Sequence, residues 1–326
     1  METRRLFLAS LAAAASLAIV GDATAQAYPS RPITIVVPFA AGGPGDTLTR
    51  ILAERMRMSL SQTVIIENVT GAGGAIGVGR VARAAPDGYT LSFGFLGTHV
   101  LNGAVYKLQY DVLKDFEPIA LLASNPQLIV AKNTVPANNL KDLIAWLKAN
   151  PDKASQGTGG VPSHVAGALF QNMTGTRFQF VPYRGGAGPA MQDLVAGQID
   201  LMFDQALNSL QHVRGGRIKV YGVTGKTRLS SAPDIPTVDE VGLPGFHMSL
   251  WYGFWAPKGT PKDIIARLNA AVVDALAHPT MRQRLADLGL EIPSREEQTS
   301  EALGAYQKAE IEKWWPIIKA ADIKVE

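Results

Sequence analysis

The stretch ITIVVPFAAGGPGDTLTRILAERM, residues 33–56, contains in order a predicted strand, a glycine-rich turn and a predicted helix start. Its first five residues are all β-branched, which favours a strand, and Pro38 ends the run. After the turn, apolar residues recur at the spacing of one helical face, at Leu48, Ile51, Leu52 and Met56. The stretch therefore predicts a βα unit in which a glycine loop joins the end of a strand to a helix.

The same order of strand, turn and helix recurs along the chain. Further strands are predicted at residues 64–66, 90–93, 178–181, 199–203 and 219–223. Further helices are predicted at residues 75–84, 140–147, 263–277 and 300–320. This repetition predicts an α/β fold of mainly parallel sheets flanked by helices on both faces, and 326 residues are enough for two lobes.

The composition excludes several classes of protein. Charged residues make up 18% of the chain and the formal net charge is +3, without the basic stripe that a nucleic-acid-binding surface needs. The absence of cysteine excludes disulfides, thiolate metal sites, iron–sulfur clusters, cysteine nucleophiles and a lipoprotein anchor. We therefore expect no nucleic-acid partner.

Residues 1–27 have the pattern of a cleavable export signal. Arg4 and Arg5 precede the apolar run 6–20, which is too short to span a bilayer permanently, and small residues follow before Tyr28. We expect cleavage near Ala27/Tyr28, by the Sec or the twin-arginine route, and a periplasmic mature protein. A retained membrane anchor is the alternative.

The sequence lacks the motifs of common enzyme classes. G-A-G-G-A-I-G (71–77) departs from a dinucleotide fingerprint because Ile76 occupies its sixth position. No phosphate-binding P-loop, nucleophile elbow or H-E-x-x-H motif occurs, and the five histidines lack metal-ligand spacing. Asp46 and Asp204 could be taken for an acid–base pair, but Asp46 is better explained at a helix start, where its carboxylate complements the dipole. We expect no enzyme activity, no metal and no cofactor.

Two of the glycine turns resemble each other. V-P-F-A-A-G-G (37–43) and V-P-Y-R-G-G (181–186) each follow a predicted strand and open a predicted helix. Two lobes that each present such a loop to a shared cleft would explain the similarity. Chance likeness of two βα turns is the alternative.

Three glycine-rich stretches, 42–46, 159–163 and 185–189, stand at predicted helix starts. Glycine allows the backbone to approach an anion closely, and the first turn of a helix has N–H groups without helical partners. If these starts converge in a cleft, they could hold one or two carboxylates without many cationic side chains. The alternative is that the glycines only shape loops.

Ten motifs in order along the residues after 27 carry a family resemblance. They are Y-P-S-R-P-I (28–33), V-P-F-A-A-G-G-P-G-D (37–46), E-N-V-T-G-A-G-G-A-I-G (67–77), A-P-D-G-Y-T-L (85–91), G-T-H-V-L-N (97–102), Y-D-V-L-K-D-F-E-P-I (110–119), P-Y-R-G-G-A-G-P-A (182–190), D-L-M-F-D (200–204), P-D-I-P-T-V-D-E-V-G-L-P-G-F (233–246) and W-Y-G-F-W-A-P-K-G-T-P (251–261). The series resembles the receptors of tripartite tricarboxylate transporters, the Bug-type periplasmic solute-binding proteins.

The resemblance implies a two-lobed Venus-flytrap fold that traps a small carboxylate ligand between its lobes. It implies delivery of that ligand to a two-subunit membrane permease by a monomeric receptor. From the family's chain path, we expect one lobe at residues 28–127 plus 252–326 and the other at 128–251. A ligand sensor that signals to a membrane partner and an exported enzyme acting on an organic acid are the alternative functions.

The resemblance also implies the residues of the binding site. In this family one carboxylate is gripped by two strand-to-helix loops, one from each lobe. The implied ligand-binding residues are Phe39, Ala40, Gly42, Gly43, Asp46, Thr98, His99, Gly159, Gly160, Ser163, His164, Tyr183, Arg184, Gly185 and Asp204.

Two positions depart from the family pattern. Pro162 stands where a small residue is common, and proline removes one N–H donor from the second loop. Arg184 stands where lysine is common, and its planar guanidinium suits bidentate binding of a second, distal carboxylate. Alternatively, Arg184 is a solvated surface cation.

The aromatic residues in 251–255 are expected to pack in the core at the return crossing between lobes, with stacking on an aromatic ligand as the alternative.

Overall fold

The structure is a computed structural model that describes residues 28–183, 185–320 and 323. The chain divides into two units, Met1–Ser30 and Arg31–Glu326, and the fold below is that of the second unit. The predicted export signal at 1–27 and the predicted role of Arg184 lie outside the described residues.

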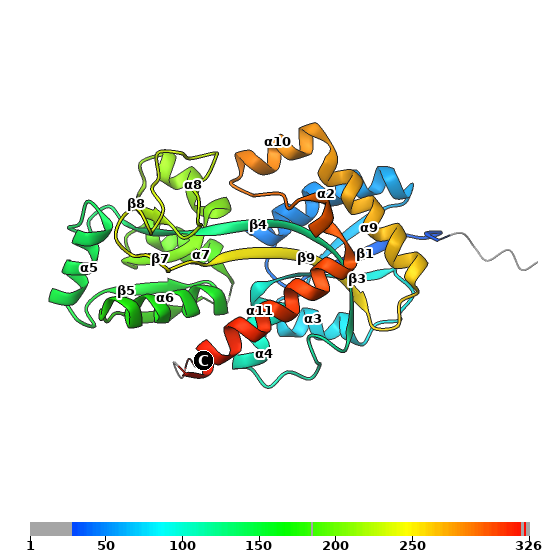
Figure 1. The fold of residues 1–326 in the computed structure, drawn as a ribbon, viewed down its shortest axis with the longest axis horizontal. Coiled ribbons are helices and arrows are strands. Elements are labelled where there is room, and N and C mark those ends of the chain that lie inside the picture. The colour runs from blue at the N-terminus through cyan, green and yellow to red at the C-terminus, as the bar shows by residue number, and fades with distance from the viewer. Residues whose placement is uncertain (1–27, 184, 321–322, 324–326) are drawn as a thin grey trace, which may run out of the picture. The chain divides into compact units, whose positions relative to one another are not determined.

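Within the described residues, nine strands form one mixed sheet in the order β2-β1-β3-β9-β4-β7-β5-β6, with β8 also paired to β4 (Figure 1). The strands are β1 Ile33–Val37, β2 Val64–Asn68, β3 Thr90–Phe95, β4 Phe116–Lys132, β5 Ser155–Thr158, β6 Gln179–Pro182, β7 Leu201–Gln205, β8 Ile218–Val223 and β9 Ser249–Pro257.

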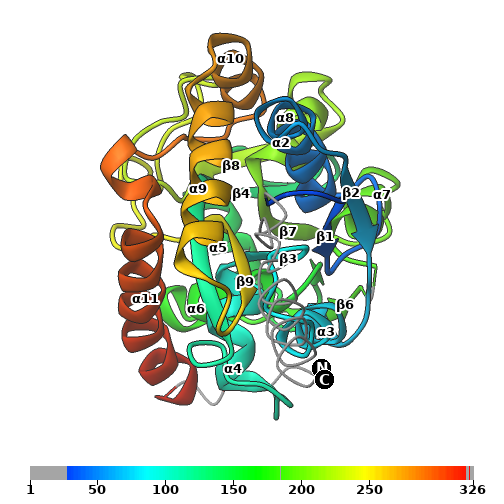
Figure 2. The ribbon, with the colours of Figure 1, turned by 90° about the vertical axis from the view of Figure 1, so that its right-hand side faces the viewer.

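Helices cover the sheet and connect its strands. They are α2 Pro44–Leu60, α3 Ala75–Ala82, α4 Asn102–Val105, α5 Leu140–Ala149, α6 Val161–Thr174, α7 Ala187–Val195, α8 Ala206–Arg214, α9 Lys262–Ala277, α10 Pro279–Asp287 and α11 Ser300–Ala320, with short non-α turns at Ala72–Gly74, Gly97–Leu101 and Arg295–Gln298. Helix α9 packs on α2 and β4, and α11 packs on β4 (Figure 2). None of the helices in the described part of the chain combines the length and apolarity needed to cross a bilayer.

The parallel βα units expected from the sequence occur in two groups. Strand β1 runs parallel to β2 and β3, and β5 runs parallel to β6 and β7. Each group places its glycine-rich turns at the carboxyl ends of its strands, directly before α2, α6 and α7. The α/β fold class is therefore confirmed.

Two long strands that the local patterns did not predict join these groups. Strand β4 pairs antiparallel with β9 over residues 116–126, and from Gln127 onward it pairs antiparallel with β7 and β8. Figure 1 shows β4 and β9 running together between the two groups. Strand β4 was not predicted because Pro118 and Pro126 argue against a strand, and the pairing of both strands is long-range.

The aromatic residues of β9 are core residues, as expected. Trp251, Tyr252, Phe254 and Trp255 are all buried. The Tyr252 ring stacks on Phe93 of β3, with 5.7 Å between ring centroids. Strand β9 thus fixes the middle of the sheet, next to the carboxyl end of β3.

Candidate functional site

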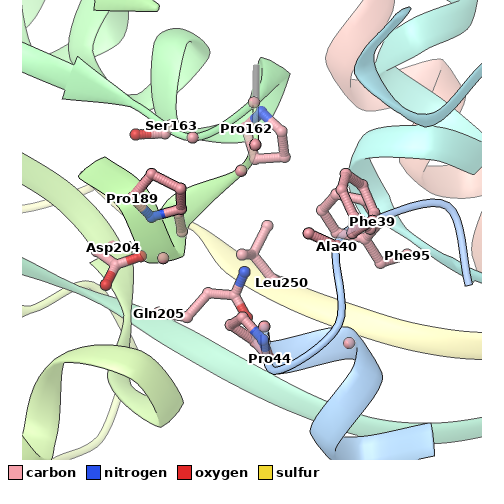
Figure 3. A pocket seen from close by; sticks show the side chains of 18 of the residues that line it. Phe39, Ala40, Pro44, Phe95, Pro162, Ser163, Pro189, Asp204, Gln205 and Leu250 are labelled. Atoms are coloured by element: carbon pink, nitrogen blue, oxygen red, sulfur yellow. The ribbon is translucent and has the colours of Figure 1, made fainter. Parts of the chain in front are cut away.

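A cavity of about 400 Å³ lies where the glycine-rich turns of the two strand groups face each other. Figure 3 shows Phe39 and Ala40 on one side, with Asp204 and Pro189 across from them. The described residues that line it are Phe39, Ala40, Ala41, Gly42, Gly43, Pro44, Gly45, Phe93, Phe95, Gln127, Gly159, Gly160, Pro162, Ser163, Gly185, Gly186, Ala187, Gly188, Pro189, Gln192, Phe203, Asp204, Gln205, Leu250 and Tyr252.

Three helix N-termini open onto this cavity. The N-caps of α2, α6 and α7 are Gly43, Gly160 and Gly186, and none of these helices has a side-chain cap. The N–H groups of their first turns therefore remain available to a ligand, apart from the nitrogens of proline. The positive ends of three helix dipoles favour a negative charge in the cavity.

Close backbone packing explains one of the glycines. A Cβ on Gly159 would lie 2.5 Å from both the nitrogen and the Cα of Ala187, at the start of α7. Two loops from β5 and β6 can approach this closely only because residue 159 has no side chain. The starts of α6 and α7 are thereby held together as one wall of the cavity.

The opposite wall is held by polar side chains. Asp46, in the first turn of α2, is only 2% exposed. Its Oδ2 accepts from the Gly42 N–H at 2.9 Å and from Arg50 Nε at 2.9 Å, and its Oδ1 accepts from Asn68 Nδ2 at 3.0 Å. Asn68 Nδ2 also donates to the Phe39 carbonyl at 2.9 Å. This network fixes the loop 39–45 from behind.

The charge state of Asp46 follows from these contacts. Burial on its own raises the pKa of the carboxyl, but the hydrogen bonds from Arg50, the Gly42 N–H and Asn68 outweigh it, and the pKa lies below the ordinary value. Asp46 is therefore ionised at neutral pH. Its charge stabilises the cavity wall and does not face a ligand, because Asp46 does not line the cavity.

A second buried aspartate lines the cavity itself. Asp204, at the end of β7, is 3% exposed. Its Oδ2 accepts from Ser209 Oγ at 2.6 Å and from Asn208 Nδ2 at 2.8 Å, both on α8. Burial raises the pKa of Asp204 to about 6, although these two hydrogen bonds and a third from the Gln205 backbone N–H lower it. No cation among the described residues forms an ion pair with Asp204.

The remaining surface of the cavity is aromatic and amide-bearing. Phe93, Phe95 and Tyr252 form the aromatic side, and the Tyr252 hydroxyl donates to Gln205 Oε1. Gln127 is 1% exposed, and its Oε1 has no hydrogen-bond partner among the described residues. No lysine, arginine or histidine occurs among the described lining residues. Backbone amides and helix dipoles are thus the described groups that can attract an anion.

Nine of the residues predicted from the sequence line the cavity. They are Phe39, Ala40, Gly42, Gly43, Gly159, Gly160, Ser163, Gly185 and Asp204. The Ser163 hydroxyl is already engaged, since it donates to the Phe203 carbonyl at 2.9 Å. Pro162 occupies the first turn of α6, where it leaves one fewer N–H donor.

The structure places Thr98 and His99 in the core, and their contact with a ligand stays a prediction. Both are fully buried and neither lines the cavity. The His99 ring stacks on Trp255 with 3.9 Å between ring centroids, and burial lowers its pKa to about 3. Its neighbour Thr98 accepts from the Phe95 N–H at 3.2 Å. These two residues stabilise the end of β3 by packing and hydrogen bonding within the core.

Three other predicted residues lie beside the cavity without lining it. Asp46 braces the first loop, as described above. The His164 ring stacks on Phe180 at 4.0 Å between centroids, and Tyr183 donates to Asp193 Oδ2 at 2.6 Å. Arg184 is not among the described residues. Gln127, Gln205, Leu250 and Asn68 were not predicted, because their positions depend on strand pairing rather than on a local motif.

The described residues contain no cluster of three or more histidine, aspartate or glutamate side chains placed to hold a metal ion.

Residues 48–323 match the model of the tripartite tricarboxylate transporter family receptor. Several solved structures are similar to this chain. The periplasmic binding protein BugD is 40% identical with a TM-score of 0.86, over 92% of this chain and 100% of that chain.

Two further structures are described with bound ligands. MatC from Rhodopseudomonas palustris, with bound malate, is 40% identical with a TM-score of 0.85, over 89% of this chain and 100% of that chain. Rpa4515 from R. palustris, with adipate, is 32% identical with a TM-score of 0.86, over 91% of this chain and 99% of that chain. This chain is thus similar to periplasmic binding proteins over most of its length.

Proposed function

The chain belongs to the tripartite tricarboxylate transporter receptor family, and from this premise we propose that it captures a small organic acid by its carboxylate. The observation that carries the proposal is the convergence of three uncapped helix N-termini, those of α2, α6 and α7, on one cavity. An anion there meets backbone N–H donors and three positive dipole ends.

The energetics of such a site are sufficient for a receptor. A hydrogen bond to a charged group contributes about 1.5–3 kcal/mol, and a micromolar complex requires about 8 kcal/mol. Three or four amide hydrogen bonds, less the cost of ordering the ligand, reach this range. No cationic side chain among the described lining residues is needed for it.

The relatives support an organic acid of dicarboxylate size. One similar structure holds malate and another holds adipate. In our proposal the chain is exported to the periplasm by residues 1–27, acts as a monomer and delivers its ligand to a two-subunit membrane permease. It performs no chemistry on the ligand.

We propose that the two lobes meet where strand β4 changes partners. Residues 116–126 of β4 pair with β9, and residues from Gln127 onward pair with β7 and β8. This change supports a crossing at 127/128 and a return crossing at 251/252 on β9. The cavity then lies between the lobes, and closure of the lobes would enclose the ligand.

Calorimetric titration with mono-, di- and tricarboxylates and aromatic acids tests the proposal. We expect at least one acid to bind with a dissociation constant in about the micromolar range. The matched neutral diamide, such as succinamide for succinate, should bind at least about a hundredfold more weakly, because it presents no charge to the helix N-termini. Absence of heat with every acid in the panel would contradict the proposal.

A further inference from the structure

The cavity of this anion receptor contains an acidic side chain that is not needed to bind the ligand carboxylate at the helix N-termini. Asp204 lines the cavity and is almost fully buried, and no cation among the described residues pairs with it. An ionised carboxyl group repels a ligand carboxylate at short range. Its presence therefore favours a ligand that also has a hydrogen-bond donor.

Asp204 is held as an acceptor. Ser209 Oγ and Asn208 Nδ2, both from α8, donate to its Oδ2. The Gln205 backbone N–H also donates to the carboxyl, which lies in the cavity wall, as Figure 3 shows. Burial and the nearby charge of Asp204 both raise the pKa of Tyr252 on β9. Neither group supplies a proton near neutral pH.

A second acceptor lies on the neighbouring strand. Gln127 of β4 lines the cavity, and its buried Oε1 has no partner among the described residues. Gln127 pairs with Gln205, the residue after Asp204, in the register between β4 and β7. A buried acceptor without a donor costs free energy that a suitable ligand group recovers.

We infer that Asp204 and Gln127 form a subsite that accepts hydrogen bonds from the ligand, and that the ligand is an organic acid bearing a hydroxyl or ammonium group. This inference rests on the proposed function, because it assumes that a carboxylate is held at the helix N-termini. The hydroxyl or ammonium hydrogen is donated to the two acceptors. An acid without such a group leaves Gln127 Oε1 unpaired and gives Asp204 no donor beyond those of the protein, and a site built to accept a hydrogen bond discriminates strongly against it.

Matched acids test the inference without any variant. Calorimetry at about pH 8 compares propionate with lactate and alanine, succinate with malate and aspartate, and glutarate with 2-hydroxyglutarate and glutamate. In the set that fits the cavity best, we expect the hydroxy or amino acid to bind at least about tenfold more tightly than its parent. Equal or tighter binding of the parent overturns the inference and leaves the receptor proposal intact. Absence of binding by every acid overturns the receptor proposal itself.

Two variants test the contribution of each acceptor separately. Gln127→Met keeps the side-chain length without an acceptor, and we expect it to reduce the preference for the hydroxy acid to less than about threefold. Asp204→Asn removes the charge, and we expect it to reduce the preference for the ammonium more than that for the hydroxyl. Unchanged preferences in both variants, each with a cooperative thermal transition, overturn the assignment of these residues.

Discussion

The two walls of the cavity present the same kind of surface but are held by different means. The wall at 39–45 is fixed by polar side chains, with Asp46 and Asn68 bonding to its backbone. The wall built from the starts of α6 and α7 is fixed by close backbone packing, with Gly159 against Ala187. Similar glycine-rich sequences thus form one wall in which Gly159 has no room for a methyl group against the backbone of Ala187, and another that depends on a hydrogen-bonded carboxylate.

The two walls also differ in the charge of their buried aspartates. Asp46 has a cationic partner, Arg50, and its pKa is lowered. Asp204 has no cationic partner among the described residues, and its pKa is raised to about 6. The first aspartate stabilises the fold, whereas the second is kept at a cost to stability, which is the pattern expected of a residue that serves binding.

The largest effect is expected for Asp204→Asn, measured as the free energy of unfolding without ligand. The folded carboxyl keeps its proton up to about pH 6, whereas the unfolded chain loses it near 3.8. The folded protein therefore binds more protons between these values, so its stability falls as the pH rises through this range and stays lower above it. The free energy of unfolding of the asparagine variant should exceed that of the wild type by up to about 3 kcal/mol at pH 8 and by little at pH 4.

Urea denaturation at the two pH values measures this difference. Asp274→Asn, at an exposed position of α9, is the matched control and should show no comparable dependence. An equal increase in the free energy of unfolding from Asp204→Asn at both pH values would show that the stabilisation does not come from removing the charge.

Gly159→Ala should have the next largest effect, on ligand affinity. The added Cβ would meet the Ala187 backbone at 2.5 Å, so one of the two loops must move and the starts of α6 and α7 lose their alignment. We expect affinity for the acid that binds best to fall at least about a hundredfold in calorimetry. Gly304→Ala on α11, where the Cβ meets Pro118 at 3.3 Å, is the control and should bind normally.

Asp46→Ala tests the other wall and should weaken binding by about ten- to thirtyfold. Its loss frees the Gly42 N–H and leaves Asn68 without one of its acceptors, so the loop loses a fixed conformation. Asn68→Ala should cause a similar loss, and the double variant should weaken binding by less than the product of the two. Fully multiplicative effects would mean that the two residues do not act on one loop.

Ser163→Ala should have the smallest effect. Its hydroxyl donates to the Phe203 carbonyl, so the group that faces the ligand at this position is the backbone N–H. We expect about a threefold loss of affinity or less, together with a loss of about 1 kcal/mol in the free energy of unfolding. A loss of binding as large as that of Gly159→Ala would assign the hydroxyl a direct contact with the ligand.

The sequence predicted those parts of the molecule that local patterns determine. The unit of β1, its glycine turn and α2 follows from residues 33–56 alone, because periodicity and turn chemistry agree there. Strand β4 was missed because Pro118 and Pro126 interrupt its pattern and because its partners lie far away in the sequence. Gln127 enters the cavity only through that pairing, so no local motif marks it.

The differences between the predicted site residues and the cavity lining have a similar origin. Thr98 and His99 follow a strand that ends near the cavity, but the sequence does not tell on which side of the strand a ring packs. The stacking of His99 on Trp255 brings together residues 156 positions apart. By contrast, the predicted glycine loops do line the cavity, because their position between strand and helix already determines where their N–H groups lie.

Backbone amide NMR tests the central claim most directly. In ¹H–¹⁵N spectra of the ¹⁵N-labelled protein, titrated with malate and with succinate, the amide resonances of Gly45, Val161, Ser163 and Gly188 report on the first turns of α2, α6 and α7. We predict large downfield proton shifts at these amides on carboxylate binding, with little change for succinamide. Binding that leaves these amides unshifted, or that shifts them equally with the neutral amide, would contradict the account.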